Sequence, residues 1–134
     1  MYGHLKAAVE ELASALEARG QKVSVFDLAR DDMAEAVEDA FRYDRLVLAS
    51  ITYQGEIFPF MSTFIHTLAG HAYQNRTVAL VEAGSWAPAA AKVMTKELEG
   101  MKDIALAQNK VTVLGSLNDA SRAQIEALAD ELSK

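Results

Sequence analysis

The stretch of residues 46–55 constrains the fold of this chain more than any other part of the sequence. Four apolar residues follow one another from Leu46 to Ala49 without polar alternation, and the chain then becomes polar and aromatic up to Gly55. An unbroken apolar run is typical of a strand that is covered on both faces, as in a parallel sheet. Ligands of open parallel sheets lie beyond the carboxyl ends of the strands. We therefore expect residues 50–55 to form a binding loop.

Short apolar runs alternate with amphipathic stretches along the rest of the chain. Apolar residues from Leu5 to Leu16 follow helical spacing, and Gly20 lies where a helix C-cap belongs. The expected strands cover residues 23–26, 45–50, 77–81 and 111–114. The expected helices begin near Leu5, Met33, Pro59, Pro88 and Ser121. Asp31 or Asp32 is the expected N-cap of the second helix, and Ser121 forms a capping-box pattern with Gln124 at the start of the last. One helix followed by four strand–helix units predicts a parallel sheet with helices on both faces.

The composition limits the class of protein. At 134 residues, the chain is expected to form a single domain, residues 1–134, with a three-layer α/β/α architecture around a doubly wound parallel sheet. Its net charge of −6 disfavours nucleic acid as a partner and suits a partner with a basic docking face. The absence of cysteine excludes disulfides, thiolate catalysis and iron–sulfur ligation. No apolar run is long enough to cross a membrane and no signal peptide is visible, so a cytoplasmic location is expected.

The beginning of the sequence is unusual for this architecture. Doubly wound folds normally start with a strand, which turns through a glycine-containing loop into the first helix, whereas this sequence begins inside such a turn, at Tyr2-Gly3-His4. One interpretation is a complete four-stranded domain, and the other is a fragment of a larger protein that lacks the first strand. In a 2-1-3-4-5 sheet that strand would lie between residues 23–26 and 45–50, and its loss would leave unpaired backbone groups on both. We then expect altered strand pairing or a homodimer.

Three segments at the carboxyl edge of the predicted sheet carry residues suited to a flat, phosphorylated ligand. They are residues 2–4, 50–58 and 82–87. Backbone N–H groups at the start of a helix favour a phosphate group, and Tyr53 and Trp86 could cover a flat ring. A single aromatic residue near a strand end is more often part of the core, but three such segments at one edge favour a binding site.

These segments resemble those of the flavodoxin-like fold, and in particular those of the C-terminal flavodoxin domain of flavodiiron proteins (A-type flavoproteins). The likeness covers essentially the whole chain. Met1-Tyr2-Gly3-His4 matches the family's phosphate turn, Ser-Met-Tyr-Gly-x-Thr, and Ala49-Ser50-Ile51-Thr52-Tyr53-Gln54 matches its segment Gly-Ser-Pro-Thr-Tyr-Asn. Ile57-Phe58-Pro59 matches an apolar segment whose proline opens a helix in the family. Ala83-Gly84-Ser85-Trp86 approximates the family's loop Gly-x-Tyr/Phe-Gly-Trp.

The resemblance implies an FMN-binding electron-transfer domain of a flavodiiron-type flavoprotein. It implies no catalytic residue and no metal ligand in this chain, and no catalysis by the chain on its own. The partner would be a redox protein or the diiron domain of the same family. The implied cofactor residues are Tyr2, Gly3 and His4 at the phosphate, Ser50, Thr52, Tyr53, Gln54 and Gly55 at the phosphate, ribityl chain or ring edge, and Gly84, Ser85 and Trp86 on the other side of the ring.

Other interpretations of the same residues stay open. A cofactor-free interaction module with this fold is favoured by Leu5, which replaces the threonine of the family's phosphate turn, and by the absent first strand. A stand-alone flavodoxin or an NAD(P)H:quinone-type FMN enzyme is a third interpretation. A receiver domain is disfavoured because Ser50 occupies the position of its phosphorylated aspartate. A zinc site at His66 and His71 is less expected than two solvent-facing histidines.

Overall fold

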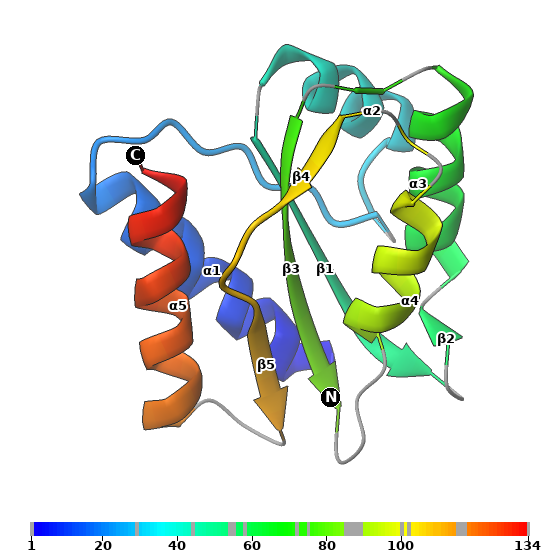
Figure 1. Cartoon of the computed structure of the whole chain (residues 1–134). Helices are drawn as coiled ribbons and strands as arrows, with labels where there is room; N and C mark the ends of the chain where they lie inside the picture. Colours follow the sequence, from blue (N-terminus) through cyan, green and yellow to red (C-terminus); the bar gives the residue numbers. More distant parts are fainter. Residues whose placement is uncertain are drawn as a thin grey trace.

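The computed structural model of the chain describes residues 2–28, 30–43, 45–53, 56–57, 59–71, 73–74, 76–84, 90–99, 101, 103–114 and 118–133. Helices and strands alternate along most of this length (Figure 1). In chain order the elements are α1 (Tyr2–Ala18), α2 (Met33–Arg42), β1 (Arg45–Tyr53), β2 (Glu56–Ile57), α3 (Pro59–Gly70), β3 (Arg76–Gly84), α4 (Ala90–Leu98), β4 (Ile104–Leu106), β5 (Val111–Leu114) and α5 (Asp119–Leu132).

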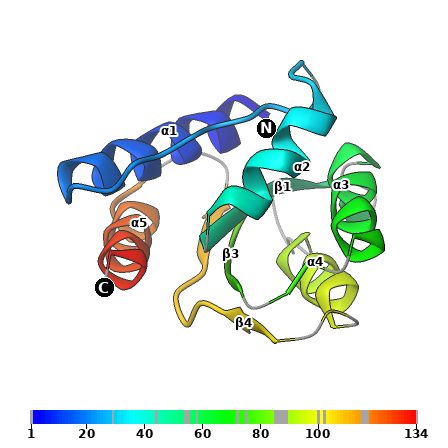
Figure 2. The same ribbon diagram turned by 90° about the horizontal axis from the view of Figure 1, so that it is seen from above.

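The sheet is the middle layer of three (Figure 2). Helices α1 and α5 cover one face, and helices α2, α3 and α4 cover the other. The buried residues form one cluster on each face. The α1/α5 cluster includes Leu5, Leu12, Leu16, Val81, Val113, Ile125, Leu128 and Leu132, and the α2/α3/α4 cluster includes Leu48, Phe64, Ile65, Leu68, Val78, Leu80, Met94 and Leu98. The predicted three-layer α/β/α architecture with a doubly wound parallel sheet is confirmed.

Strand β3 is the centre of the sheet. β1 runs parallel to it in a register that sets Val47 beside Ala79. β4 pairs with the first part of β3 and β5 with its last part, both in parallel and both on the edge opposite β1. Between β4 and β5 the chain leaves the sheet, and the Glu131 carboxylate accepts bonds from the N–H groups of Gln108 and Asn109 at 2.8 and 2.9 Å. The sequence predicted β5 but not β4, whose apolar run is too short to be distinguished from a loop.

The ends of three helices follow from local chemistry. Gly20, after α1, has φ +83°, a left-handed conformation that glycine adopts without steric penalty. Asp32 caps α2, as predicted, by accepting a bond from the N–H group two residues later at 2.9 Å. The predicted box from Ser121 to Gln124 is wrong, because α5 starts one turn earlier. Asn118 is the N-cap, and it exchanges bonds with the N–H and hydroxyl groups of Ser121 at 3.0 and 2.9 Å.

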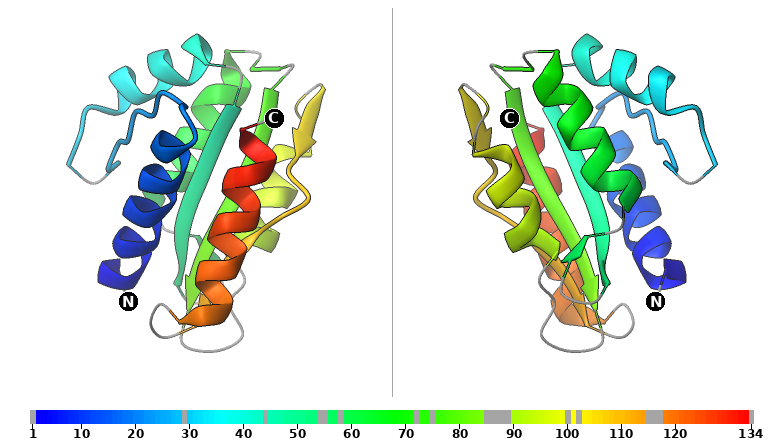
Figure 3. Two further views of the ribbon diagram at one scale, coloured as in Figure 1. Left: turned by 90° about the vertical axis from the view of Figure 1, so that its left-hand side faces the viewer. Right: turned by 90° about the vertical axis from the view of Figure 1, so that its right-hand side faces the viewer.

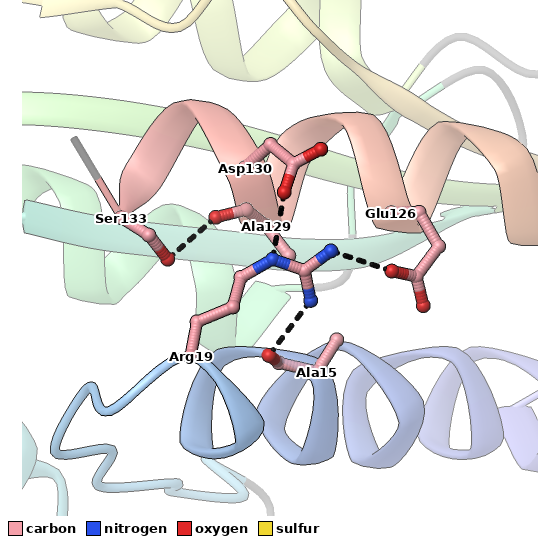
Figure 4. A network of polar contacts seen from close by, with 6 residues as sticks. All are labelled: Ala15, Arg19, Glu126, Ala129, Asp130 and Ser133. Atoms are coloured by element: carbon pink, nitrogen blue, oxygen red, sulfur yellow. Dashed lines mark hydrogen bonds and ion pairs between the residues drawn. The ribbon is translucent and has the colours of Figure 1, made fainter.

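The ends of α1 and α5 are joined by Arg19 (Figure 4). Its guanidinium donates to Glu126 Oε2 at 2.7 Å and to Asp130 Oδ1 at 2.8 Å, and also to the Ala15 carbonyl at 2.9 Å. Hydrogen bonds to Glu126 first, and to Asp130 second, raise the pKa of Arg19 above its ordinary value. The network fixes the C-terminal turn of α1 against α5. No helix in the described part of the chain is long and apolar enough to cross a membrane.

Residues 21–27 do not form the strand that the sequence predicted at residues 23–26. The segment leads from α1 to α2 beyond the β1 side of the sheet (Figure 3), and no described strand pairs with it. Val23 packs against the α1/α5 cluster and Phe26 against the other cluster, but Val25 is 56% exposed. Alternating apolar residues alone therefore do not make a strand here. Strands are stabilised by cross-strand neighbours. Among the described residues, no strand lies between this segment and β1 to provide such neighbours.

Candidate functional site

The first helix begins at the carboxyl edge of the sheet. Tyr2, Gly3 and His4 form the first turn of α1, so the prediction of a turn before the helix is wrong for these residues. His4 is exposed. The chain N-terminus lies at the end of the molecule where β3 ends (Figure 1). The first N–H groups of a helix have no partner inside it, and the first turn of α1 contains no acidic residue. The start of α1 therefore presents backbone donors and a positive dipole end at this edge.

Strand β1 takes in much of the predicted binding loop, because it extends to Tyr53. Ser50 lies inside the strand and is 2% exposed, and its hydroxyl donates to the Ile51 carbonyl at 3.1 Å. Thr52 and Tyr53 pair with the antiparallel strand β2. The prediction of a loop that starts at Ser50 is therefore wrong. The chain continues the ladder beside β3 as far as Ile51, and the next two residues pair with β2.

Strand β3 also extends beyond its predicted end. Glu82, Ala83 and Gly84 belong to the strand and not to the loop that the sequence predicted. Glu82 is 3% exposed and Ala83 is fully buried. The structure thus brings the first turn of α1, the end of β1 and the end of β3 to one edge of the sheet. The other predicted cofactor residues, Gln54, Gly55, Ser85 and Trp86, lie outside the described residues.

Glu82 is a buried carboxylate that the sequence did not identify as a site residue. Its Oε1 accepts a bond from the N–H group of Ala91, in the first turn of α4, at 3.0 Å. Its Oε2 accepts a bond from the Thr112 hydroxyl at 2.9 Å and lies 3.3 Å from the Lys110 ammonium. The register places Ser50, Glu82 and Thr112 side by side on three neighbouring strands. The one signal in the sequence is that Glu82 directly follows an apolar run.

The N-termini of α1, α4 and α5 differ in whether a negative side chain, such as that of Glu82, compensates them. A negative side chain at a helix N-terminus satisfies its N–H groups and compensates the positive end of the dipole. Helix α4 receives this compensation from Glu82; α5 has an N–H group satisfied by its cap Asn118 and a negative charge from Asp119 in its first turn. Helix α1, in contrast, has no acidic residue in its first turn. Of these three helix starts, α1 is the one suited to an external anion.

Other candidate sites in the chain have weaker support. His66 lies 3.7 Å from the Glu97 carboxylate, which also accepts a bond from the Ser62 hydroxyl at 2.8 Å. Among the described residues, no group of three or more histidine, aspartate or glutamate side chains could hold a metal ion. A groove between α2 and α3 is lined by four apolar side chains together with Glu38, Thr67 and His71. It lies along the helix layer and not at the carboxyl edge.

The comparison with known proteins concerns the fold. No protein-family model and no curated protein matches the sequence. Among solved structures, the chain is similar to rubredoxin oxygen:oxidoreductase from Desulfovibrio gigas, with a TM-score of 0.91 and 17% identity over 99% of this chain and 33% of that one. A flavodiiron protein from Giardia intestinalis gives 0.86 and 15% over 98% and 33%. A flavodoxin from the domain Archaea gives 0.85 and 16% over 99% and 90%.

Two kinds of protein therefore share this architecture. The chain spans about a third of the length of the oxidoreductase and of the flavodiiron protein, but nearly the full length of the archaeal flavodoxin. Identities of this size identify a common architecture and do not assign one of the two roles. The chain has the flavodoxin-like fold over essentially its whole length.

Proposed function

We propose that this chain is an FMN-binding electron-transfer domain of the flavodiiron or flavodoxin type. The observation that carries the proposal is the meeting of three segments at the carboxyl edge of a flavodoxin-like sheet. They are the first turn of α1, the end of β1 and the end of β3. In open parallel sheets a ligand binds beyond this edge. When bound, FMN supplies the redox chemistry, and the protein supplies binding, orientation and electrostatics.

The phosphate group of FMN fits the start of α1 and not the start of α4. The first turn of α1 has backbone donors and no acidic residue, and His4 is exposed beside them. The buried carboxylate of Glu82 already bonds to α4, where it would repel a phosphate group. We therefore assign Tyr2, Gly3 and His4 to the phosphate end of the cofactor. This agrees with the implication of the sequence resemblance.

The remaining cofactor residues follow from the two strand ends. Thr52 and Tyr53 close β1, and Gly84 closes β3. The residues that follow them in the sequence, Gln54, Gly55, Ser85 and Trp86, would bind the ribityl chain and the ring. Ser50 has a different role, because its side chain is buried inside β1. We assign Ser50 to the support of the site and not to direct contact with the cofactor.

The partner of such a domain would be a redox protein or a diiron domain. The net charge of −6 suits a partner with a basic docking face, because charge complementarity accelerates association. Such a contact weakens as the ionic strength rises.

Titration with FMN, followed by flavin fluorescence, tests the proposal. We expect quenching with micromolar or tighter binding, and weaker binding of riboflavin, which lacks the phosphate group. The variant His4→Glu places a carboxylate in the first turn of α1 and should weaken FMN binding about tenfold, as expected for a repulsion of about 1.4 kcal/mol. Ala120→Glu is the matched control, since it places a carboxylate on an exposed residue in the first turn of α5. Absence of quenching in the wild-type chain would refute the proposal.

A cofactor-free interaction module is the second candidate, and Leu5 is the observation that favours it. Its side chain is 7% exposed and belongs to the α1/α5 cluster. The position at which the family has a phosphate-binding threonine therefore offers no hydroxyl group here. If this candidate is correct, addition of the protein will leave the fluorescence of FMN and of riboflavin unchanged.

A further inference from the structure

Glu82 joins the two elements that flank the ring side of the proposed cofactor site. It lies near the end of β3, and its Oε1 accepts a bond from the N–H group of Ala91, at the start of α4, at 3.0 Å (Figure 1). Residues 85–89 connect β3 to α4, and they include Ser85 and Trp86, which are assigned above to the cofactor. One hydrogen bond therefore holds together the two ends of the segment that carries these residues.

The Glu82 carboxylate is oriented by the sheet as well as by α4. Its Oε2 accepts a bond from the Thr112 hydroxyl at 2.9 Å and lies 3.3 Å from the Lys110 ammonium. The register places Thr112, on β5, directly beside Glu82. A carboxylate with a donor at each oxygen has a defined orientation. Its Oε1 is thus an acceptor at a fixed place in the sheet, to which the start of α4 is bound.

The first turn of α4 has little side-chain surface of its own with which to hold its position. Ala91 is 3% exposed, but its side chain is a single methyl group. The larger buried side chains of α4, Met94 and Leu98, pack in the α2/α3/α4 cluster further along the helix. Apolar stabilisation scales with the area that is buried. The body of α4 is therefore held by its apolar side chains, whereas the position of its first turn depends strongly on the bond to Glu82.

The phosphate side of the proposed cofactor site has a different support. The start of α1 is held by Leu5, which packs in the α1/α5 cluster on the other face of the sheet, and the last turn of α1 is bonded to α5 through Arg19. A change at Glu82 therefore acts on the ring side and leaves the phosphate side as it is. Riboflavin has the ring without the phosphate group, so a comparison of riboflavin with FMN separates the two sides.

We propose that Glu82 is a positioning residue for the flavin ring, because it fixes the first turn of α4 relative to β3 and thereby the segment that carries Ser85 and Trp86. This inference rests on the proposed function, since it concerns the ring of the cofactor assigned there. Glu82 acts through Ala91 and not by contact with the flavin. A site that is held in its bound arrangement loses less conformational freedom on binding. The acceptor oxygen carries this role, so glutamine can replace glutamate.

Titrations of the full chain with FMN and with riboflavin, followed by flavin fluorescence, test the proposal. We expect Glu82→Ala to weaken the binding of both flavins about tenfold, with the ratio of the two affinities unchanged within about twofold. Glu82→Gln keeps the acceptor and should stay within about twofold of the wild-type chain for both. Val78→Ala is the matched control for stability, because it shortens a fully buried side chain in the part of β3 that pairs with β4. It should leave both affinities unchanged.

Amide hydrogen exchange of the flavin-free chain gives a second measurement. The N–H group of Ala91 lies in the first turn of α4, where a helix offers no acceptor of its own, so its protection comes from Glu82. We expect this amide to exchange faster by about tenfold or more in Glu82→Ala. Its exchange should not change in Glu82→Gln or in Val78→Ala.

Three results of the titrations would overturn the proposal while the proposed function stands. They are unchanged affinities in Glu82→Ala, equal weakening by Glu82→Gln and Glu82→Ala, and tighter binding of FMN alone in both variants, which would place Glu82 near the phosphate group. A wild-type chain that binds neither flavin refutes the proposed function and this inference with it. If Glu82→Ala does not fold, Thr112→Val decides in its place. It removes the hydroxyl that orients Oε2 and should weaken the binding of both flavins about threefold.

Discussion

Replacement of Glu82 tests how the carboxyl edge of the sheet is held together. In Glu82→Ala, the N–H group of Ala91 loses its acceptor while it remains buried, since Ala91 is 3% exposed. A buried donor without a partner costs about 1–3 kcal/mol. The hydroxyl of Thr112 and the ammonium of Lys110 also lose their partner, and each is less buried. We expect Glu82→Ala to lower the free energy of unfolding by about 2–4 kcal/mol.

The isosteric variant Glu82→Gln separates the acceptor from the charge. Its amide oxygen can still accept the Ala91 bond, and the Thr112 hydroxyl can rotate to accept from the amide nitrogen. What is lost is the attraction to Lys110, whose side chain is 52% exposed. For such a partner the loss is about 0–1 kcal/mol. Glu82→Gln should therefore be more stable than Glu82→Ala by at least about 1 kcal/mol.

Urea unfolding, followed by circular dichroism, measures both variants under the same conditions. Lys110→Met is the matched control, because it removes the cation and keeps every hydrogen bond of Glu82. Its effect should be small in the wild-type chain and absent in the Glu82→Gln background. Equal destabilisation by Glu82→Gln and Glu82→Ala would show that the charge, and not the acceptor, holds α4 to β3. A neutral Glu82→Ala would refute the role of this carboxylate altogether.

Three further predictions concern the packing and the helix ends. Val81→Ala, at a fully buried residue, should lower the free energy of unfolding by about 2 kcal/mol, whereas Val47→Ala, at a half-buried residue of β1, should lower it by less than about 1 kcal/mol; equal effects in urea unfolding would contradict this difference in burial. Asn118→Ala should lower it by about 1 kcal/mol through loss of the α5 cap, and an unchanged unfolding midpoint would contradict the assigned cap. Arg19→Met should lower the thermal midpoint less in high salt than in low salt. Because the raised pKa of Arg19 lies far above neutrality, the group stays charged in both states and the effect of Arg19→Met should not change from about pH 6 to about pH 9.

The sequence predicted the helices well because their signals are local. Gly20 and Asp32 mark helix ends with side chains or conformations that act within a few residues. The start of α5 shows the limit of such signals. Ser121 belongs to a capping box, but as the partner of Asn118 and not as its first residue. Two overlapping patterns were available in the sequence, and only the hydrogen bonds of the folded chain distinguish them.

The strands were predicted less well because their extent depends on neighbours. β1 and β3 pair with each other as far as Ile51 and Ala83, so polar residues such as Ser50 and Glu82 are carried inside the sheet. The apolar alternation at residues 23–26 predicted a strand that the structure does not contain. A short strand signal becomes a strand when a ladder is beside it. No window of the sequence reports that condition.

The carboxyl-edge site was predictable in outline but not in its electrostatics. The topology alone places the start of α1 and the ends of β1 and β3 at one edge, and the alternation of elements was visible in the sequence. Glu82 could not be assigned, since its partners Ala91, Thr112 and Lys110 are brought to it by the fold. From the sequence alone, a glutamate that follows an apolar run is equally compatible with a solvent-exposed loop. The proposed assignment of a phosphate group to α1 rests on this carboxylate and its bond to α4.

The position of α1 links the proposed cofactor site to the rest of the fold. Its buried face, with Leu5 and Leu12, packs in the cluster that contains β3 and α5. Its last turn is held to α5 by Arg19. The start of α1 is therefore fixed by the helix layer and by the centre of the sheet, even though no described strand leads into it.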